Sequence, residues 1–491
     1  MATVVREGTT QTKVLIIGAG IAGISSAEYL AKNGFTDFKI IEAADRIGGR
    51  IWTHDIGGTS LKVEMGANWI HGIERNPIYQ IADENGLLQL RYKDKGLRHR
   101  NIFLTETGVE VHSKTVMECD FTYGLLIQQC EEFFQMSMPT PYDIDSVGDY
   151  MDVEIEEKLE NFMGSERKMR EMIFNQHIKQ ETVVSGCNDL HEVSLSEFGC
   201  YEELPGVHYT IPPGFQSVLD ILLGKVPENN ILLNHTVKSI RWGNNDNDGG
   251  VLVECENGRK FSAERIIWTC SLGVLKASCD RMIDPPVDRM FDPPLPKEKR
   301  DAIERLGFGV VDRVNLIFDE PIVDTDIFRI ELLWDDESYN AENRNPDMST
   351  LWYRKLYSFE VVNDNLLSGY LCGKEALYME SLTEDQIASD LRGVLEKFLK
   401  KHIPLPTKVV RSRWGNSKNT RGSYCYIKVG ATVGDVDTLA QPICDNNGKP
   451  LLQFAGEATH SSFYSTTHGA LLTGHREAKR ILDLYGIANS K

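Results

Sequence analysis

Three glycines and one acid near the start of the chain have the types and spacing of a dinucleotide-binding motif. Gly18, Gly20 and Gly23 follow the pattern G-x-G-x-x-G, and the carboxylate of Glu42 comes later in the chain. The first glycine permits a tight turn, the second lets a pyrophosphate approach the backbone, and the third lets a helix pack closely on a strand. A carboxylate in the position of Glu42 accepts hydrogen bonds from ribose hydroxyls. These residues predict the binding of a dinucleotide.

The glycine motif lies in a segment that predicts a strand, a turn, a helix and a second strand. Residues 14–17 are apolar and mostly β-branched, as a buried parallel strand requires. The helix predicted over 21–33 directs its N-terminus, with its free N–H groups, at the phosphates. Residues 38–41 form the next strand, and Glu42 stands at its end. The alternative is a tight glycine turn, but a complete strand–helix–strand unit with its acid favours dinucleotide binding.

Longer blocks of the chain resemble the flavin-dependent amine oxidases, and within them the polyamine oxidases. The blocks are EAADRIGGR (42–50), EMGANWIHG (64–72), WTCSLGVL (268–275), PPLPKEKRDAIERLGFG (293–309), SRWGNSKNTRGSYCY (412–426) and FAGEATHSSFYSTTHGALLTG (454–474). The last two are most similar to animal spermine and acetylpolyamine oxidases. The resemblance implies an α/β fold, in which a Rossmann-like FAD-binding domain carries an inserted substrate-binding domain of mixed sheet and helices.

Both predicted domains are discontinuous in sequence. We assign residues 1–88, 209–295 and 437–491 to the FAD-binding domain, and residues 89–208 and 296–436 to the substrate-binding domain. One stretch has no assigned function: DRMIDPP (280–286) is nearly repeated as DRMFDPP (288–294), in a proline-rich loop.

Bulk composition narrows the class of protein. The net charge of −19 would concentrate polycationic substrates and repel nucleic acid, although solvated acidic faces explain most of it. There is no apolar signal segment, no apolar run of membrane-spanning length and no S-K-L ending, so we expect a cytoplasmic protein that is a monomer or weak dimer. The ten cysteines form no CxxC pair, and no cluster has metal-ligand spacing, so we expect no metal site.

The resemblance implies the residues that hold FAD. They are Gly18, Gly20, Ala22 and Gly23 at the pyrophosphate, Glu42 at the ribose, Arg50 at the phosphates, Asn68 and Trp69 near the flavin ring, Val237 at the adenine, Glu457 at the ribityl or pyrophosphate, and Thr466 and Thr467 against the isoalloxazine. Monoamine oxidases attach their flavin to a cysteine at the position that aligns with Ser423. Cys425 is two residues further on. We therefore predict noncovalent FAD.

The resemblance also implies the residues that contact the amine. His71 aligns with a histidine that contacts substrate in animal polyamine oxidases, and its neutral imidazole would accept a hydrogen bond from an ammonium. Tyr424 and Tyr426 match aromatic walls that sandwich the reacting amine, with Thr466 nearby. Without the resemblance, the sequence predicts both tyrosines as core residues of a strand. Asp189 and Glu192 are further acids for distal ammonium groups, in a stretch where the family varies.

The clearest departure from the family is Arg313. Family members carry a lysine there that holds a water against flavin N5. Arginine keeps the charge but is bulkier, forked and never deprotonated. The implied reaction is oxidation of spermine, spermidine or N1-acetylated forms by hydride transfer to flavin, giving an aldehyde, a shorter amine and hydrogen peroxide from dioxygen. Two alternatives remain: a regulatory flavin-binding pseudoenzyme, suggested by Arg313, and a histone-lysine demethylase-like oxidase.

Overall fold

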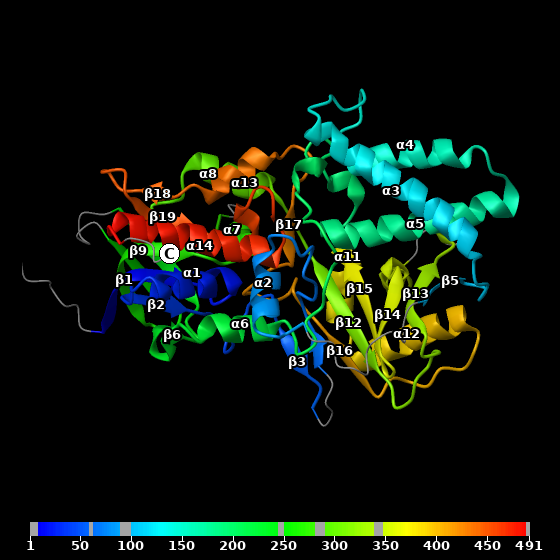
Figure 1. Cartoon of the computed structure of the whole chain (residues 1–491), viewed down its shortest axis with the longest axis horizontal. Coiled ribbons are helices and arrows are strands. Elements are labelled where there is room, and N and C mark those ends of the chain that lie inside the picture. The colour runs from blue at the N-terminus through cyan, green and yellow to red at the C-terminus, as the bar shows by residue number, and fades with distance from the viewer. Residues whose placement is uncertain are drawn as a thin grey trace, which may run out of the picture.

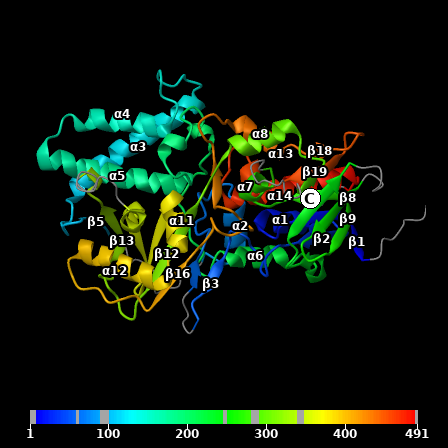
Figure 2. The same ribbon diagram turned by 180° about the vertical axis from the view of Figure 1, so that it is seen from behind.

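Two β-sheets, each with its own helices, make up the chain. The computed structural model describes residues 8–57, 62–88, 100–243, 250–279, 290–337 and 347–487. In Figure 1 the first sheet lies at the left with the helices α1 and α14, and the second lies at the right below α3, α4 and α5. Figure 2 shows the same two halves from behind, with the described C-terminal segment in the half that also holds the beginning of the chain.

The first sheet has nine strands in the order β10-β7-β8-β9-β1-β2-β6, with β19 beside β9 and β18 beside β19. The strands are β1 (Thr9–Ile17), β2 (Phe38–Ile41), β6 (Ile231–Leu232), β7 (Val237–Trp242), β8 (Val251–Cys255), β9 (Lys260–Trp268), β10 (Phe291–Asp292), β18 (Ile443–Cys444) and β19 (Pro450–Phe454). Its central strands β19, β9, β1, β2 and β6 are parallel, so their carboxyl ends meet at one edge. Ligands bind at such an edge in open α/β sheets.

The first and last helices of this half pack against each other. The helix α1 (Ile21–Lys32) and the helix α14 (Thr467–Leu484) lie side by side in both views, one blue and one red. Ser26 Oγ donates to the carbonyl oxygen of Gly474 at 3.0 Å. A Cβ on Gly474 would lie 2.3 Å from the carbonyl oxygen of Ala22, so only glycine permits this close approach. The two ends of the sequence therefore form one layer over the sheet.

The remaining helices of this half are short. They are α2 (Pro77–Glu84), α6 (Gln216–Leu223), α7 (Leu272–Cys279), α8 (Lys297–Arg305) and α13 (Val433–Ala440), with the 3₁₀ turns η3 (Glu228–Asn230) and η6 (Glu457–Thr459).

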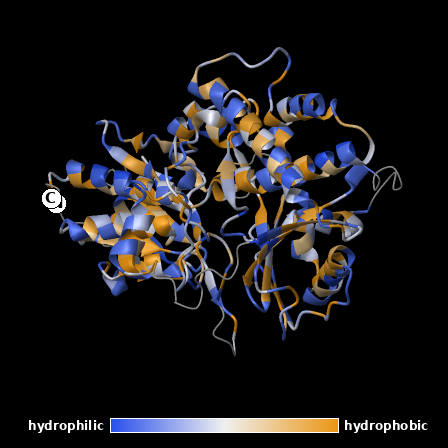
Figure 3. Ribbon diagram, turned by 45° about the vertical axis from the view of Figure 1, so that its right-hand side comes forward, coloured by the Kyte–Doolittle hydropathy of each residue, from blue (hydrophilic) through white to orange (hydrophobic). Residues whose placement is uncertain are grey.

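The second sheet has six strands in the order β16-β12-β15-β14-β13-β5, antiparallel except for the pair β13 and β5. The strands are β5 (Arg100–Thr105), β12 (Val311–Ile317), β13 (Ile327–Leu333), β14 (Ser358–Asn363), β15 (Leu366–Cys372) and β16 (Lys408–Arg411). Two small pairs, β3 (Thr53–Asp55) with β4 (Lys62–Glu64) and β11 (Gly307–Gly309) with β17 (Tyr424–Tyr426), lie between the halves. The strands of the second sheet are mainly orange in Figure 3, and the helices above them mix blue and orange faces.

Helices cover both faces of the second sheet. The helix α5 contacts β13 on one side and α12 contacts β16 and β5 on the other. Here the helices are α3 (Ser113–Gln135), α4 (Val147–Leu159), α5 (Gly164–Ser185), α10 (Met348–Leu351), α11 (Gly373–Ser381) and α12 (Glu384–Leu399), with the 3₁₀ turns η1 (Leu190–Glu192), η2 (Phe198–Cys200) and η5 (Trp352–Lys355). Thr383 and Gln386 form a capping box that starts α12.

The predicted fold class, α/β with an inserted unit of mixed sheet and helices, is confirmed. The helix expected over 21–33 is Ile21–Lys32, and the strand expected over 14–17 begins earlier, as Thr9–Ile17. No helix among the described residues has the length and apolar character to span a membrane. Of the near-repeated proline-rich loop, residues 280–289 lie outside the described residues.

The proposed domain division stays a prediction, and the helix α8 bears on where its boundary falls. This helix lies in the stretch assigned to the substrate domain, whereas its buried Ile303 packs in the hydrophobic core of the first sheet. Lys299 on the same helix donates to the carbonyl oxygens of Leu439 and Gln441, each at 2.7 Å. These contacts tie α8 to α13 and the first half of the molecule.

Candidate active site

One cavity of about 1800 Å³ runs from the carboxyl edge of the first sheet to the second sheet. Most of the residues predicted from the sequence line it. They are Gly18, Gly20, Ala22, Glu42, Arg50, Asn68, Trp69, His71, Val237, Arg313, Tyr424, Glu457, Thr466 and Thr467. Gly23 and Tyr426 do not line it. The cavity brings together segments that are hundreds of residues apart in sequence.

The glycine end of the cavity has the geometry that a pyrophosphate requires. Gly18 has a φ of +108°, in the region that favours glycine. A Cβ on Gly23 would lie 2.0 Å from the carbonyl oxygen of Gly18, so α1 can start this close to β1 only without a side chain there. The N-terminus of α1 then points its free N–H groups into the cavity. This loop fits the phosphates of FAD.

Glu42 is buried, and it already accepts two hydrogen bonds from the protein. Its carboxylate oxygens accept from the backbone N–H of Ala19 at 2.7 Å and of Ala44 at 2.9 Å. These bonds fix the carboxylate at the cavity wall. A carboxylate has about four acceptor positions, so capacity remains for ribose hydroxyls.

Glu457 joins four segments of the chain. One oxygen accepts from Arg50 Nη1 at 2.8 Å, and the other accepts from the backbone N–H groups of Cys425 and Ser465 at 3.3 and 3.2 Å. Arg50 also donates to the carbonyl oxygen of Ser423 at 2.6 Å. The Arg50–Glu457 pair therefore connects the N-terminal and C-terminal motifs at the cavity wall.

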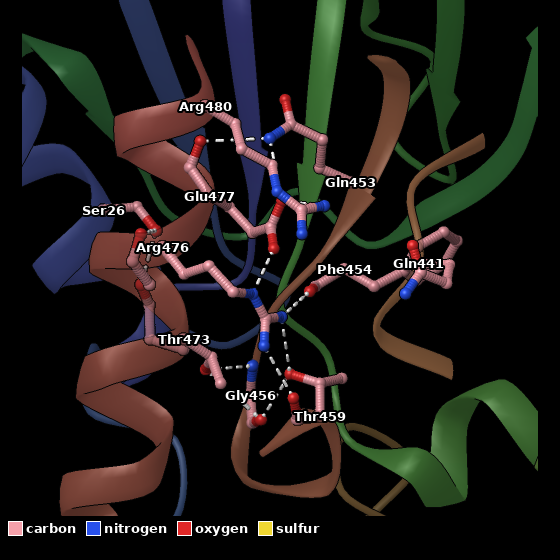
Figure 4. A network of polar contacts seen from close by, with 12 residues as sticks. Ser26, Gln441, Gln453, Phe454, Gly456, Thr459, Thr473, Arg476, Glu477 and Arg480 are labelled. Atoms are coloured by element: carbon pink, nitrogen blue, oxygen red, sulfur yellow. Dashed lines mark hydrogen bonds and ion pairs between the residues drawn. The ribbon is translucent and has the colours of Figure 1, made fainter. Parts of the chain in front are cut away.

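A second arginine supports the turn that holds Glu457 (Figure 4). Arg476 donates to the carbonyl oxygens of Phe454 and Thr459 at 2.9 and 2.8 Å and pairs with the buried Glu477. The backbone N–H of Gly456 donates to Thr473 Oγ1 at 2.9 Å. All three supporting side chains come from α14, so this helix fixes the position of the turn.

The N-terminus of α14 opens into the cavity. Thr466 caps the helix, because its Oγ1 accepts from the backbone N–H of Gly469 at 3.0 Å. Thr467 is the first helical residue, and both threonines line the cavity. The positive end of the helix dipole favours negative charge here, as a reduced flavin ring would provide.

His71 opens into the cavity beside a second histidine. The rings of His71 and His208 meet edge to face, with 5.3 Å between centroids. His208 Nδ1 accepts from the backbone N–H of Gly72 at 3.1 Å, and its Nε2 lies 3.4 Å from Glu203. Shielding from bulk water, and then the neighbouring His208, lower the pKa of His71 to about 4. Its imidazole is therefore neutral at physiological pH and able to accept a hydrogen bond.

Arg313 is buried on β12, where neighbouring strands hold its guanidinium. Its Nε donates to Ser368 Oγ, and its Nη1 lies 3.4 Å from the carbonyl oxygen of Glu64. Its Nη2 lies 3.9 Å from Glu360, and the guanidinium lies 5.1 Å from the ring centroid of Tyr370. The side chain lines the cavity but is committed to several protein contacts.

The two predicted tyrosines differ in position. Tyr424 lines the cavity and donates its hydroxyl to the carbonyl oxygen of Val183. Tyr426 points elsewhere, because its hydroxyl donates to Glu192 at 2.6 Å. Asp189 is engaged with His191, at 2.6 Å from its Nδ1. Neither acid lines the cavity.

Ser423 is the residue that aligns with the flavin attachment site, and Cys425 is two residues further on. The hydroxyl of Ser423 exchanges hydrogen bonds with the backbone of Val311, each of 2.8 Å. Cys425 is buried and does not line the cavity, and burial raises the pKa of its thiol well above the ordinary value. A protonated, inaccessible thiol is a poor nucleophile.

Several cavity residues are not apparent from the sequence motifs. They include the acids Glu131 on α3, Glu181 on α5 and Glu203, with Glu256 and Asp312 elsewhere in the lining. Burial raises the pKa of Glu181 to about 7, and burial followed by the charge of Glu203 raises the pKa of Glu131. Arg329, Tyr357 and Tyr370 also line the cavity, and they belong to the second sheet or its edge. Among the described residues, no group of His, Cys, Asp or Glu is arranged to hold a metal ion.

Comparisons with known proteins agree with this geometry. The sequence model of a family described as "Flavin containing amine oxidoreductase" matches residues 21–482. The human peroxisomal N(1)-acetyl-spermine/spermidine oxidase is 37% identical, over 98% of this chain and 97% of its own. A rice lysine-specific histone demethylase 1 homolog 2 is 30% identical, over 96% of this chain but 57% of its own. The structure of a putrescine oxidase mutant with redesigned cofactor binding, 19% identical, has a TM-score of 0.67 and covers 97% of this chain and 100% of its own.

Proposed function

Because this chain belongs to the flavin-containing amine oxidoreductase family, we propose that it oxidises polyamines, either spermine and spermidine or their N1-acetylated forms. When bound, FAD supplies the acceptor for a hydride from the carbon next to the reacting nitrogen, and dioxygen then takes the electrons and becomes hydrogen peroxide. The imine product hydrolyses to an aldehyde and a shorter amine. The observation that carries the proposal is one continuous cavity with a dinucleotide-binding end and an end with three carboxylates.

Each end of the cavity has a part in this reaction. The glycine loop, Glu42 and Arg50 would bind the FAD, noncovalently, and the start of α14 would face its ring. The neutral imidazole of His71 would accept a hydrogen bond from an ammonium group of the substrate. The carboxylates of Glu181 and its two acidic neighbours would attract the distal ammonium groups of a polycation. Tyr424 and Thr466 would flank the reacting amine.

Arg313 is the residue that bears on whether the oxidase reaction is fast. We propose that it takes the place of the family lysine that holds a water beside flavin N5. Its contacts with Ser368, Glu64 and Glu360 draw the guanidinium toward the sheet, which would hinder that role. This position also favours the second candidate, a flavoprotein that has lost oxidase activity and acts by binding.

A peroxide assay on the purified protein tests the proposal. The panel is spermine, spermidine, N1-acetylspermine and N1-acetylspermidine, with a dimethylated histone H3 peptide to test the demethylase alternative. We expect peroxide in stoichiometric amounts with aldehyde from at least one polyamine, and none from the peptide. Yellow protein that yields no peroxide with any polyamine would instead support the binding role.

We also propose a cytoplasmic location and a monomeric or weakly dimeric state. The human relative is peroxisomal by its name, so imaging of a fluorescent fusion, with the C-terminus free and a peroxisomal marker alongside, is the decisive comparison. Sedimentation at micromolar concentration tests the assembly state. We propose no nucleic-acid or membrane partner, and dioxygen as the second substrate.

A further inference from the structure

Two buried carboxyl groups hold the loop formed by residues 412–423, which we call the cavity loop. Asp312 on β12 and Glu380 on α11 are these groups, and we call them the carboxyl pair. Asp312 Oδ1 accepts from Ser412 Oγ at 2.6 Å and from the backbone N–H of Trp414 at 3.0 Å. The two oxygens of Glu380 accept from the next two backbone N–H groups, at 2.7 and 2.8 Å. The carboxyl pair therefore binds three consecutive backbone N–H groups of the cavity loop.

The cavity loop lies along the part of the cavity that we assign to FAD. Residues 417–421 line the cavity, as do Trp414 and Ser423. The indole Nε1 of Trp414 donates to the carbonyl oxygen of Met65 at 2.9 Å, and the carbonyl oxygen of Ser423 accepts from Arg50. Both ends of the loop are thus joined to the N-terminal motifs, and the position of the loop depends on the carboxyl pair.

The carboxyl pair also acts on the backbone of Arg313, the next residue after Asp312. Ser412 donates its hydroxyl to Asp312, and its Oγ accepts from the backbone N–H of Arg313 at 2.8 Å. The backbone N–H of Ser412 donates to the carbonyl oxygen of Arg313 at 3.0 Å. The cavity loop and the start of the Arg313 side chain are therefore set by the same two carboxyl groups.

Two adjacent buried carboxylates repel each other unless a cation or a proton compensates them. Arg411 on β16 lies near the pair, but its Nη2 donates to the backbone carbonyl oxygens of Glu380 and Leu382. The charges of Arg413 and Glu384 act on Arg411 in opposite directions. Within the part of the chain that the structure describes, the Nε and Nη1 of Arg411 have no hydrogen-bond partner. Arg411 therefore does not form a hydrogen-bonded ion pair with either carboxyl group.

A proton compensates the pair instead. Asp312 Oδ2 is buried, and no donor among the described residues reaches it. Burial, and then the hydrogen bond with Glu380 and its negative charge, raise the pKa of Asp312 well above the ordinary value. A proton on Oδ2 lets Asp312 donate to Glu380 and removes the repulsion. One negative charge then remains on Glu380, where it accepts the two backbone N–H groups.

We propose that Asp312 and Glu380 share one proton and act as positioning residues for the FAD. Neutral Asp312 donates to ionised Glu380, and this arrangement fixes the cavity loop against the cofactor. The same arrangement fixes the backbone of Arg313. This inference rests on the proposed function only for the FAD, and no part of it depends on turnover.

Conservative substitutions test the assignment, because the two amides reproduce it unequally. Asp312→Asn keeps the acceptor oxygen and supplies an N–H donor to Glu380. It should bind FAD with a Kd within about threefold of wild type and keep the hydrogen-exchange protection of the cavity loop. Glu380→Gln places an amide donor against a backbone N–H, so it should weaken FAD binding about tenfold or more and reduce that protection. Titration of the flavin-free protein with FAD, and exchange followed by mass spectrometry, measure both effects.

Asp390→Asn is the matched control. This half-buried carboxylate on α12 accepts from Trp352 Nε1 at 3.1 Å and does not line the cavity. The same chemical change there should alter neither FAD binding nor the protection of the cavity loop.

Melting temperatures across pH separate a shared proton from a merely structural role. The folded wild type would keep a proton that the unfolded chain releases, so its stability should fall relative to Asp312→Asn as pH rises from 5 to 8. The difference in melting temperature should widen by about 1–2 °C for each pH unit. If Glu380→Gln does not fold, Asp312→Asn and its melting curves decide alone.

Three results would overturn the inference. They are a constant difference in melting temperature, an Asp312→Asn protein that loses FAD, and a Glu380→Gln protein that binds FAD as wild type does. Absence of peroxide with every polyamine would instead remove the proposed reaction and leave these measurements to stand by themselves.

Discussion

The two ends of the cavity are built in different ways. The end around Gly18 and Glu42 is formed largely by backbone groups, by Gly18 and Gly23, where a Cβ would clash, and by helix N-termini. The end around His71, Glu181 and Arg329 is formed by side chains from helices and strands. A backbone-built site depends on the fold itself, whereas a side-chain-built site changes its ligand with single substitutions. The cofactor is therefore set by the architecture, and the amine by a few side chains.

The largest effect that would test this contrast is expected from Glu457→Ala. The change leaves Arg50 without its carboxylate partner and frees the backbone N–H groups of Cys425 and Ser465. Breaking a buried ion pair costs about 3–5 kcal/mol. We expect the purified variant to lose its flavin and to unfold at lower temperature. The ratio of flavin to protein absorbance and a thermal unfolding curve measure both effects.

Glu457→Gln is the control for that experiment. It keeps an acceptor oxygen of the same size and removes the charge, so it should retain more flavin than the alanine variant. If Glu457→Ala kept its full flavin content and melting temperature, the connecting role of this carboxylate would be disproved.

A smaller but still large effect is expected from Gly23→Ala. The added Cβ would lie 2.0 Å from the carbonyl oxygen of Gly18, so α1 must move away from β1. Overpacking of this kind costs about 1–3 kcal/mol, and the phosphate loop moves with the helix. We expect weaker flavin binding in a titration of the flavin-free protein and a lower free energy of unfolding.

Gly124→Ala provides the matched comparison. Gly124 lies within α3, and a Cβ there would have no neighbour within 4 Å. The same substitution should stabilise this helix by up to about 1 kcal/mol and leave flavin binding unchanged. Equal destabilisation by both substitutions would mean that the space at Gly23 is not what matters.

The same contrast explains what the sequence could predict. The backbone-built end leaves local signatures: G-x-G-x-x-G before a helix and an acid after a strand predicted β1, α1, β2 and the place of Glu42. The resemblance added Thr466 and Thr467 near the C-terminus, and α14 (Thr467–Leu484) begins there. These elements are confirmed because one short segment contains both the motif and the element that positions it.

The side-chain-built end has no such signature. Glu131 and Glu181 stand in helices among many other acids, and nothing local distinguishes the two that face a cavity. Tyr426 matches the same aromatic pattern as Tyr424, but its hydroxyl donates to Glu192 and the residue does not line the cavity. The position of Arg329 in the cavity lining depends on the pairing of β13 with β14, which joins residues that are distant in sequence. Such a site depends on tertiary contacts that single-sequence patterns do not encode.

A moderate effect on the amine end is expected from Glu181→Gln. Loss of this carboxylate should raise the KM for a polycation about tenfold, because removing one partner of a buried charge pair leaves the other charge uncompensated. Burial raises the pKa of Glu181 to about 7, so the carboxylate form increases as pH rises from 6 to 8. The advantage of wild type over the variant should grow over that range. Steady-state kinetics of both proteins between pH 6 and 8 give the ratio of their KM values.

The raised pKa has a second consequence for stability. The folded protein holds this proton more tightly than the unfolded chain, so the contribution of Glu181 to stability falls as pH rises from about 4.5 to 7. Because glutamine does not titrate, the stability of Glu181→Gln should not fall for this reason over the same pH range. Glu160 is an exposed acid at the end of α4, and Glu160→Gln makes the same charge change away from the cavity. This control should leave the pH dependence of KM and of the free energy of unfolding as in wild type.

The smallest expected effect comes from Arg313→Lys, and it tests how finely the amine end is tuned. Lysine lacks the fork that reaches Ser368, Glu64 and Glu360, so its ammonium would be released from the sheet toward the cavity. We expect reoxidation of the reduced flavin by dioxygen, followed by stopped-flow absorbance, to become about two- to fivefold faster, which corresponds to less than about 1 kcal/mol of barrier. Arg329→Lys makes the same chemical change on β13, in the lining of the same cavity, and should leave that rate unaltered. An unchanged or lower rate for Arg313→Lys would mean that arginine is not a handicap at this position.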